Sequence, residues 1–433
     1  MRFGRTRAIA VMSTFVLLAG CIGTARDEPQ AAPGGPISVL VWGEPEEIEA
    51  YRRVVEGFAA VEPGIEVRLI ETGDRDDLLA RLSTSFAGGT PPDLFLLNYR
   101  FVGQYAARGV LEPIQGRLEE SDAFAPEDFF PVALEAFTFD GVLTCLPQNV
   151  SSLVVYYNRD LFREARLPEP QPGWDFFEMV NLARLLTVDR DGDRRPEQYG
   201  LGVEPSIIRL APFIWSNGGT LVDDEAAPTR FTLEEPAAVE VIQAFFDLRE
   251  ELEVIPTERE TEAQADEDRF LNGTTAMVLA SRRETPSFRT ITDFEWDVAP
   301  LPVFQEPAGI LHSDAYCMPR ASEHKEAAWR FMEFALGPEG QRITAQAGRT
   351  VPSLIDVANS DAFLDPSLPP ANSHVFLDTI PSIRRVPNIS TWPEIEERTD
   401  ELLEIGMYQR VSALDIAQRI IRETSEIFAR AAP

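Results

Sequence analysis

Between residues 37 and 107 the chain alternates short runs of β-forming residues with segments of helical periodicity. The runs at 37–42, 65–70 and 93–97 predict strands, and the segments at 48–58, 78–86 and 101–107 predict helices. This order is typical of a parallel sheet covered by helices, so it predicts an α/β protein. In such sheets ligands collect at the carboxyl ends of the strands.

Two loops at these strand ends carry side chains suited to binding. Trp42 and Glu44 follow the first predicted strand, and Asn98 and Tyr99 follow the third. We therefore expect these four residues at a ligand site.

The N-terminus predicts export. Arg2, Arg5 and Arg7 form a basic segment, and residues 8–18 are apolar but too few to span a bilayer. The segment ends in Leu-Ala-Gly followed by Cys21, which resembles a bacterial lipoprotein signal. Residues 1–20 are the predicted signal peptide, and Cys21 would carry lipid. An ordinary signal peptide with an incidental cysteine is the alternative.

The remaining composition separates a tether from a large folded part. Residues 21–36 are rich in Ala, Gly and Pro without periodicity and predict a flexible tether. The rest is too long for one compact core, so two lobes are expected. A net charge of −32 argues against nucleic acid as a partner. Cys145 and Cys317 are expected as two buried free thiols, with a disulfide as the alternative.

An ordered series of motifs runs through nearly the whole chain. Residues 92–98 and 104–113 read PDLFLLN and QYAARGVLEP, and further matches lie at 141–147, 155–162, 172–177, 217–220, 270–277, 299–302 and 328–341. This series resembles the sugar-binding proteins of bacterial ABC importers, the maltose-binding-protein-like family. The resemblance implies a two-lobe α/β periplasmic-binding-protein fold of type II, with a ligand cleft between lobes joined by crossing strands.

The same resemblance implies boundaries for the lobes. Lobe one is expected over 37–147 plus 296–336, and lobe two over 148–295 plus 337–433. Two parallel sheets that face each other leave a cleft, and a ligand that touches both lobes favours the closed form.

A sugar site needs flat aromatic surfaces together with fixed donors and acceptors. Trp42 and Trp392 are the preferred cleft aromatics, because Trp392 heads a segment similar to one that packs on sugar in the family. Core packing is at least as good an interpretation for Trp174, Tyr156 and Trp215. The full set of expected ligand-binding residues is Trp42, Glu44, Asn98, Tyr99, Gln148, Asn149, Trp215, Asn217, Arg282, Asp314, Tyr316, Arg349 and Trp392.

One segment departs from the family pattern. Where a cleft tryptophan is usual, residues 277–284 have none and instead contain Arg282 and Arg283. A guanidinium can fork onto an acidic group, so an acidic sugar stays open. Salt bridges within the lobe are the alternative.

Asp189, Asp191 and Asp193 stand at alternate positions, as in calcium loops. The loop lacks the glycine at its sixth position, and Gly200 stands where the bidentate glutamate would be. We therefore prefer a solvated turn after a helix over 176–186 and keep calcium as a weak candidate.

No catalytic motif is present among the nucleophile, zinc and phosphate-loop signatures, and the chain has only His312, His324 and His374. We expect a lipid-anchored, extracytoplasmic, monomeric receptor, without enzyme activity or cofactor, that captures a carbohydrate and delivers it to ABC-transporter permease subunits. The alternatives are a receptor for another polar solute, a protein that presents a ligand to a membrane sensor, and a carbohydrate-active hydrolase.

Overall fold

The computed structural model describes residues 35–193 and 195–431. The predicted signal peptide, Cys21 and nearly all of the tether lie outside the described residues. Within the described ranges, no helix combines the length and the apolar character that crossing a membrane requires.

The first sheet has five strands in the order β2-β1-β3-β11-β6. The strands are β1 (Ile37–Trp42), β2 (Val67–Thr72), β3 (Leu94–Asn98), β6 (Cys145–Pro147) and β11 (Asp314–Cys317). β1 pairs in parallel with β2 and β3, whereas β11 runs antiparallel to β3 and to β6. The predicted β-α-β-α-β order is confirmed, with β2 beginning two residues late because a turn from Glu62 to Ile65 precedes it.

Helices surround this sheet. The larger ones are α1 (Pro45–Val61), α2 (Arg75–Ala87), α3 (Tyr99–Ala106), α13 (Lys325–Leu336) and α14 (Pro338–Gln346). Smaller elements are α4 (Gln115–Glu119), the 3₁₀ turn η1 (Pro126–Asp128), α5 (Pro131–Ala136) and the hairpin of β4 (Thr138–Phe139) and β5 (Val142–Leu143). α1 begins with Pro45 in its first turn and with Glu47 accepting from the Glu44 amide, a capping box.

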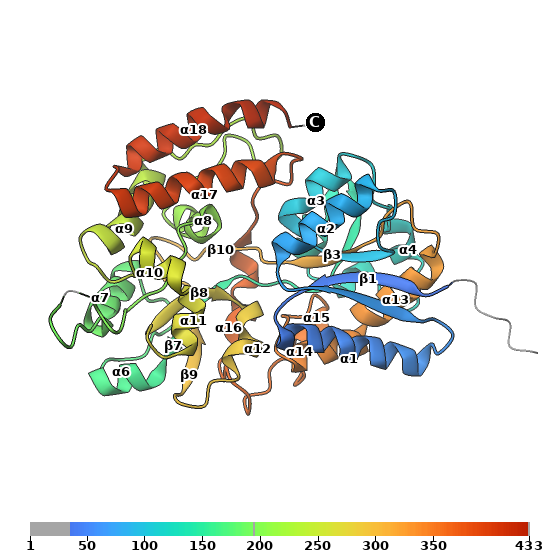
Figure 1. The fold of residues 1–433 in the computed structure, drawn as a ribbon, viewed down its shortest axis with the longest axis horizontal. Coiled ribbons are helices and arrows are strands. Elements are labelled where there is room, and N and C mark those ends of the chain that lie inside the picture. Colours follow the sequence, from blue (N-terminus) through green and yellow to red (C-terminus); the bar gives the residue numbers. More distant parts are fainter. Residues whose placement is uncertain (1–34, 194, 432–433) are drawn as a thin grey trace, which may run out of the picture. The chain divides into compact units, whose positions relative to one another are not determined.

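The second sheet has three strands, with β7 (Leu153–Asn158) between β8 (Met277–Ser281) and β9 (Trp296–Ala299). Its helices are α6 (Arg159–Ala165), α7 (Phe176–Leu186), α8 (Ile207–Ser216), α9 (Pro236–Glu250), α10 (Glu258–Ala263), α11 (Asp266–Leu271), α12 (Thr285–Phe288), α16 (His374–Asp378), α17 (Trp392–Gln409) and α18 (Ala413–Ala429), with 3₁₀ turns η2 (Arg282–Glu284) and η3 (Ile380–Ser382). The short helix α15 (Ile355–Ala358) packs against α14 beside the first sheet. The long helices α17 and α18 lie side by side and pack on α9 (Figure 1).

The two sheets define two α/β lobes, and two expected boundaries differ from the structure. β9 begins at Trp296 but pairs with β7, so residues 296–299 belong to the second sheet and not to lobe one. α14 begins after Gly337 but packs beside α1 on the first lobe (Figure 1). Both boundaries are wrong because hydrogen bonding and helix packing, which local motifs do not reveal, assign these segments to the other lobe.

Several chain segments cross between the lobes and pair with one another. The Ser151 amide donates to the His312 carbonyl, the His312 amide donates back to Ser151, and the Val150 amide donates to Val351. Farther along, β10 (Gly309–Ile310) pairs with β12 (Ile383–Arg384). The crossing is therefore a hydrogen-bonded junction.

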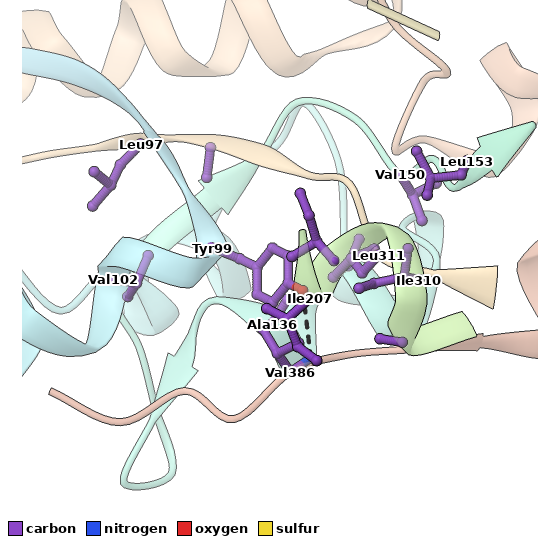
Figure 2. Packing of buried hydrophobic residues seen from close by; sticks show 14 of the residues in the cluster. Leu97, Tyr99, Val102, Ala136, Val150, Leu153, Ile207, Ile310, Leu311 and Val386 are labelled. Carbon is purple, nitrogen blue, oxygen red and sulfur yellow. Dashed lines mark hydrogen bonds between the residues drawn. The ribbon is translucent and has the colours of Figure 1, made fainter. Parts of the chain in front are cut away.

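Apolar side chains fill this junction (Figure 2). Tyr99, Ile207, Leu311 and Val386 are buried there, and the Val386 amide donates to the Tyr99 hydroxyl at 3.4 Å. The junction core thus holds elements of both lobes together.

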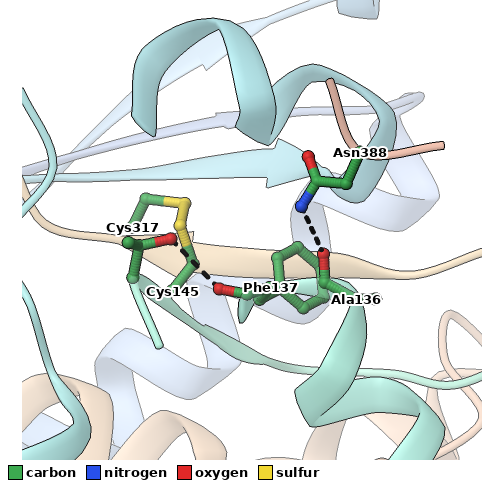
Figure 3. The surroundings of a disulfide bond; sticks show 6 residues. Ala136, Phe137, Cys145, Cys317 and Asn388 are labelled. Carbon is green, nitrogen blue, oxygen red and sulfur yellow. Dashed lines mark hydrogen bonds between the residues drawn. A yellow bond between two sulfur atoms is a disulfide. The ribbon is translucent and has the colours of Figure 1, made fainter. Parts of the chain in front are cut away.

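Cys145 and Cys317 form a disulfide (Figure 3). They are directly opposite each other on the neighbouring strands β6 and β11, with their Cα atoms 4.4 Å apart. The expected pair of free thiols is therefore wrong, because residues separated by 172 positions in sequence become partners across a sheet.

Candidate functional site

A polar cleft of about 750 Å³ lies where the lobes meet. We call its three parts the first wall, the second wall and the floor. The first wall consists of Trp42, Glu44, Asp74, Arg75, Asn98 and Arg100; the second wall of Glu204, Arg209, Glu267, Arg283, Glu284, Glu396 and Asp400; and the floor of Asn149, Ser151, His312, Asp314 and Arg349. The crossing segments form the floor, so a ligand bound there would contact the junction between the lobes directly.

Seven of the expected ligand-binding residues line this cleft: Trp42, Glu44, Asn98, Asn149, Arg282, Asp314 and Arg349. The first three stand at strand ends of the first sheet, as the β-α-β-α-β pattern predicts. Asn98 and Asp314 are cross-strand partners, and the Asn98 amide donates to Asp314 at 3.1 Å.

The other six do not line the cleft. Trp392 was expected to stack on sugar, but it is 0% exposed and packs edge-on against Phe231. Its indole N–H donates to Glu396 at 2.9 Å, so it supports the second wall from behind. Trp215 is buried on α8 under the Arg384 guanidinium. Both assignments are corrected, because these helices turn their tryptophans into the core of the lobe.

The remaining four are also buried polar or aromatic side chains with partners inside the protein. Tyr99 lies in the junction core, and the Gln148 amide donates to Tyr51 at 3.2 Å. Asn217 donates to the Ala237 carbonyl after α8. Tyr316 packs against Phe331, two residues from the cleft edge of β11. The expectation that these four residues contact the ligand is corrected for the same reason, because each side chain already has its partners inside the protein.

Trp42 is the aromatic platform of the first wall. It is 7% exposed, and two guanidiniums lie over its ring, Arg283 at 5.2 Å and Arg349 at 5.8 Å from the centroid. Such cation–π contacts stabilise cations that are withdrawn from water. Because Arg283 comes from the second lobe, it brings the second wall against Trp42.

Glu47 is a buried carboxylate that the sequence interpretation missed. Arg349 Nε lies 2.8 Å from Glu47 Oε1, an ion pair not aligned for a hydrogen bond, and Arg283 reaches Glu47 at 3.8 Å. Burial by itself lowers the pKa of Arg349, but nearby Tyr51 and Glu47 outweigh it and hold that pKa above its ordinary value. Arg349 therefore stays charged, and the signal for Glu47 was its position three residues after Glu44 in the capping box.

A second ion pair joins the lobes. Arg100 on α3 pairs with Glu396 on α17, whose other oxygen accepts from Trp392. Arg100 Nε also donates to Asn98, which in turn bonds Asp314. A continuous polar network thus runs from α17 through the first wall to the floor.

The two arginines that replace the expected family tryptophan have different environments. The Arg282 guanidinium donates to the Gly348 carbonyl and the Ser373 hydroxyl and lies over the rings of Phe363 and Phe376. Burial lowers its pKa to about 9. Its head is therefore directed into the second-lobe core. The alternative interpretation, a salt bridge within the lobe, fits Arg283, which pairs with Glu284 at 2.6 Å.

Burial also governs the titratable groups of the second wall. It raises the pKa of Glu284 to about 6, against the effect of Arg283 and with help from Glu267. Burial and the neighbouring Glu396 raise the pKa of Asp400 well above its ordinary value. The pKa of His312 on the floor is lowered well below its ordinary range by burial and then by Arg209 and Arg100, so its imidazole is neutral.

In the acidic turn after α7, the carboxylates that lie close together are not the set expected from the sequence. Carboxylates of Asp189, Asp191 and Glu197 lie within 4.8 Å of one another and are exposed. Asp193 is outside this group and accepts from the Arg195 amide at 2.8 Å. These carboxylates serve as turn acceptors.

Two α/β lobes with a polar cleft at their strand ends define the class of two-lobe solute-binding proteins. The model of the bacterial extracellular solute-binding protein family matches residues 43–342, and the chain belongs to that family. It is 22% identical over 402 residues to a maltotriose-binding protein of Pyrococcus abyssi, covering 89% of this chain and 82% of that protein. It is also 22% identical over 432 residues to a maltooligosaccharide ABC transporter solute-binding lipoprotein of Streptococcus pneumoniae, covering 98% of each.

The fold matches solved structures of the same architecture. An ABC substrate-binding protein of Listeria monocytogenes in complex with cycloalternan superposes with a TM-score of 0.84 at 23% identity, over 91% of this chain and 99% of that one. This match confirms the predicted two-lobe fold.

Proposed function

We propose that the protein is a carbohydrate receptor of an ABC importer, anchored outside the cytoplasm through lipid on Cys21. The observation that carries the proposal is the cleft itself, which combines one indole platform, Trp42, with fixed polar groups from both lobes and from the floor. Sugars need this combination, because they present C–H faces together with a rim of hydroxyls. The relatives that bind maltotriose and maltooligosaccharides support the same class of ligand.

Capture would work by closure. Arg283 of the second lobe lies over Trp42 of the first, so a sugar ring that takes this face must replace Arg283 there and contact both lobes. A ligand favours the closed form only through contacts that the open form lacks. No covalent step is part of this function, and the permease subunits would receive the ligand unchanged.

Among the lining residues of the described chain, Trp42 is the one indole or phenol ring. Long oligosaccharides are usually held by several aromatic surfaces, so a short ligand fits this cleft better than a long one.

A thermal-shift screen with glucose, galactose, maltose, trehalose, glucosamine and glucuronate tests the function. A ligand bound only by the native state stabilises it by about 2.7 kcal/mol at a hundredfold excess over Kd. Trp42→Ala should then reduce affinity by about 2–4 kcal/mol in calorimetry, and Trp42→Phe by less, because a flat ring remains. Chromatography of the recovered ligand separates receptor from hydrolase, since a hydrolysed ligand contradicts the proposal.

Anchoring has its own test. Labelled fatty acid should enter the wild-type protein in cells but not Cys21→Ser, which should also leave the membrane fraction. Absence of label in the wild type would remove the lipid anchor and leave the receptor function untouched.

A further inference from the structure

Two charged side chains of the cleft floor, Asp314 and Arg349, lie next to each other without forming a hydrogen bond. Arg349 Nη2 is 3.8 Å from Asp314 Oδ2, longer than the roughly 3.2 Å that an N–H···O hydrogen bond allows. Both side chains are almost completely buried, with 2% of Arg349 and 8% of Asp314 exposed, and both line the cleft. Each therefore keeps an unused hydrogen-bonding atom beside that of the other.

The rest of the Asp314 side chain is held in place. Asn98 Nδ2 donates to Asp314 Oδ1 at 3.1 Å, and the Asp314 amide donates to Asn149 Oδ1 at 2.9 Å. Among the described residues, none donates a hydrogen bond to Oδ2, and Arg349 Nη2 is its ion-pair partner. Asp314 thus presents one fixed carboxylate oxygen as an acceptor on the floor.

Arg349 is held from its other side. Its Nε lies 2.8 Å from Glu47 Oε1, and its guanidinium lies 5.8 Å from the centre of the Trp42 ring and 6.0 Å from that of Tyr51. Its Nη2 is a buried atom without a hydrogen-bond partner. A buried donor without an acceptor destabilises a protein until another molecule supplies one. The floor therefore offers a fixed donor next to the fixed acceptor of Asp314.

A group that satisfies both atoms must accept one hydrogen bond and donate another. A hydroxyl does so, because its oxygen accepts from Arg349 Nη2 and its hydrogen is donated to Asp314 Oδ2. A carboxylate or phosphate oxygen lacks the hydrogen and is repelled by Asp314, whereas an ammonium lacks the acceptor and is repelled by Arg349. The pair therefore selects an uncharged hydroxyl.

We propose that Asp314 and Arg349 form a subsite for one hydroxyl of the ligand and thereby determine which sugars the receptor accepts. The inference rests on the proposed carbohydrate function and deepens it. Because Arg349 lies beside the Trp42 ring, a sugar stacked on the indole presents a hydroxyl of its rim to the pair. The ligand group at the floor is uncharged, whatever groups the ligand directs toward the walls.

The fixed positions of the two side chains give the subsite its selectivity. Asn98 holds Asp314 from one side and Glu47 holds Arg349 from the other, so the subsite does not adapt to a misplaced group. A sugar whose hydroxyl is missing, or points to the other face of the ring, leaves both charged groups unpaired. Sites built to bind a hydroxyl reject analogues that lack it for this reason.

The test is calorimetry with ligands that lose one hydroxyl at a time. Glucose, galactose and maltose are each compared with their monodeoxy and monofluoro derivatives. At the position that meets the pair, both changes should weaken binding by about tenfold to a hundredfold, because each removes the hydrogen that Asp314 accepts. Fluorine is the informative replacement, since it lacks only the donor function of the hydroxyl.

One variant assigns this effect to Asp314. In Asp314→Asn the amide oxygen accepts from Asn98, so the NH₂ group takes the place of Oδ2 and an acceptor becomes a donor. At the sensitive position, the preference for hydroxyl over fluorine should then fall to about threefold or less, and preferences at other positions should stay as in the wild type. Asp122→Asn is the matched control, because Asp122 is exposed on the first lobe and does not line the cleft. Thermal unfolding verifies that both variants are folded.

The outcomes separate the subsite from the receptor function. A sugar whose deoxy and fluoro derivatives all bind as tightly as the parent overturns the subsite and leaves the carbohydrate receptor standing, as does a hydroxyl preference that Asp314→Asn does not change. Mannitol is included as a polyol without a sugar ring. Mannitol binding that Asp314→Asn abolishes, without binding of any sugar, supports the subsite and overturns the carbohydrate function. No binding of any of these compounds contradicts both proposals.

Discussion

The first wall of the cleft is organised by strand ends, whereas much of the second wall is carried by helices. Trp42 and Asn98 are the last residues of β1 and β3, and their polar neighbours connect inward through Glu47 and Arg349. In the second wall, Arg209 and Glu396 lie on α8 and α17, and Arg283 lies in the turn after β8.

Buried carboxyl groups also differ between the two lobes. In the first lobe, burial by itself raises the pKa of Asp93, but donors from Ser38 and Ser322 outweigh it and lower that pKa. In the second, burial dominates and raises the pKa of Glu284 and Asp400. Hydrogen-bond donors thus compensate burial at Asp93, whereas burial prevails at Glu284 and Asp400.

The largest expected effect comes from the Glu47–Arg349 ion pair behind the first wall. Glu47→Ala leaves Arg349 buried without its nearest carboxylate, and the free energy of unfolding should fall by about 3–5 kcal/mol. Urea denaturation measures it. Glu49→Ala on the same helix is the control, because Glu49 is exposed and should change stability by less than about 0.5 kcal/mol. Equal losses in the two variants would show that Glu47 is not a structural ion pair.

Trp392→Ala tests the support behind the second wall. Removing this fully buried indole should lower the free energy of unfolding by about 3–5 kcal/mol through cavity formation. Trp392→Phe keeps an apolar ring but loses the donor to Glu396, so it should cost about 1–2 kcal/mol. Direct sugar stacking would instead show as lost affinity with unchanged stability.

The disulfide joins two neighbouring strands of the first sheet, β6 and β11. Replacing both Cys145 and Cys317 by Ala should lower the free energy of unfolding by about 2–4 kcal/mol. Thermal unfolding with and without dithiothreitol measures it. The reductant should lower the Tm of the wild type toward that of the double variant and leave the Tm of the variant unchanged. A wild type whose Tm stays the same with reductant contradicts the disulfide.

The smallest effect is a gain in the second lobe. Burial, with help from Glu267, raises the pKa of Asp266 to about 7, above the ordinary value of about 4. The folded protein then binds more protons than the unfolded chain between these values. This contribution to stability is complete below about pH 4 and is lost as pH rises through about 7.

Asp266→Asn should therefore raise the free energy of unfolding by about 1–2 kcal/mol at pH 8 and by almost nothing at pH 4. Denaturation at both pH values measures it. Asp268→Asn on the same helix is exposed and should show no such pH dependence. A gain of equal size at both pH values would point to a cause other than titration.

Local signals predicted the first wall well. Strand periodicity placed Trp42, Glu44 and Asn98 at the cleft, because the carboxyl end of a parallel strand meets the ligand edge wherever the strand sits. The sequence pattern of a helix does not show in the same way which of its side chains face the cleft. Trp392 heads a helix in the expected position, yet its ring faces the core, whereas Glu396 one turn later faces the cleft.

By itself, the sequence determined the α/β class, the two lobes, the membership in a family of solute receptors and the strand-end residues of one wall. These follow from periodicity and from motifs that lie within a few residues of each other. Only the tertiary structure decided which lobe holds β9 and α14, that Cys145 meets Cys317, and that Arg100 pairs with Glu396. Such pairings join residues tens to hundreds of positions apart, and they depend on sheet register and helix packing.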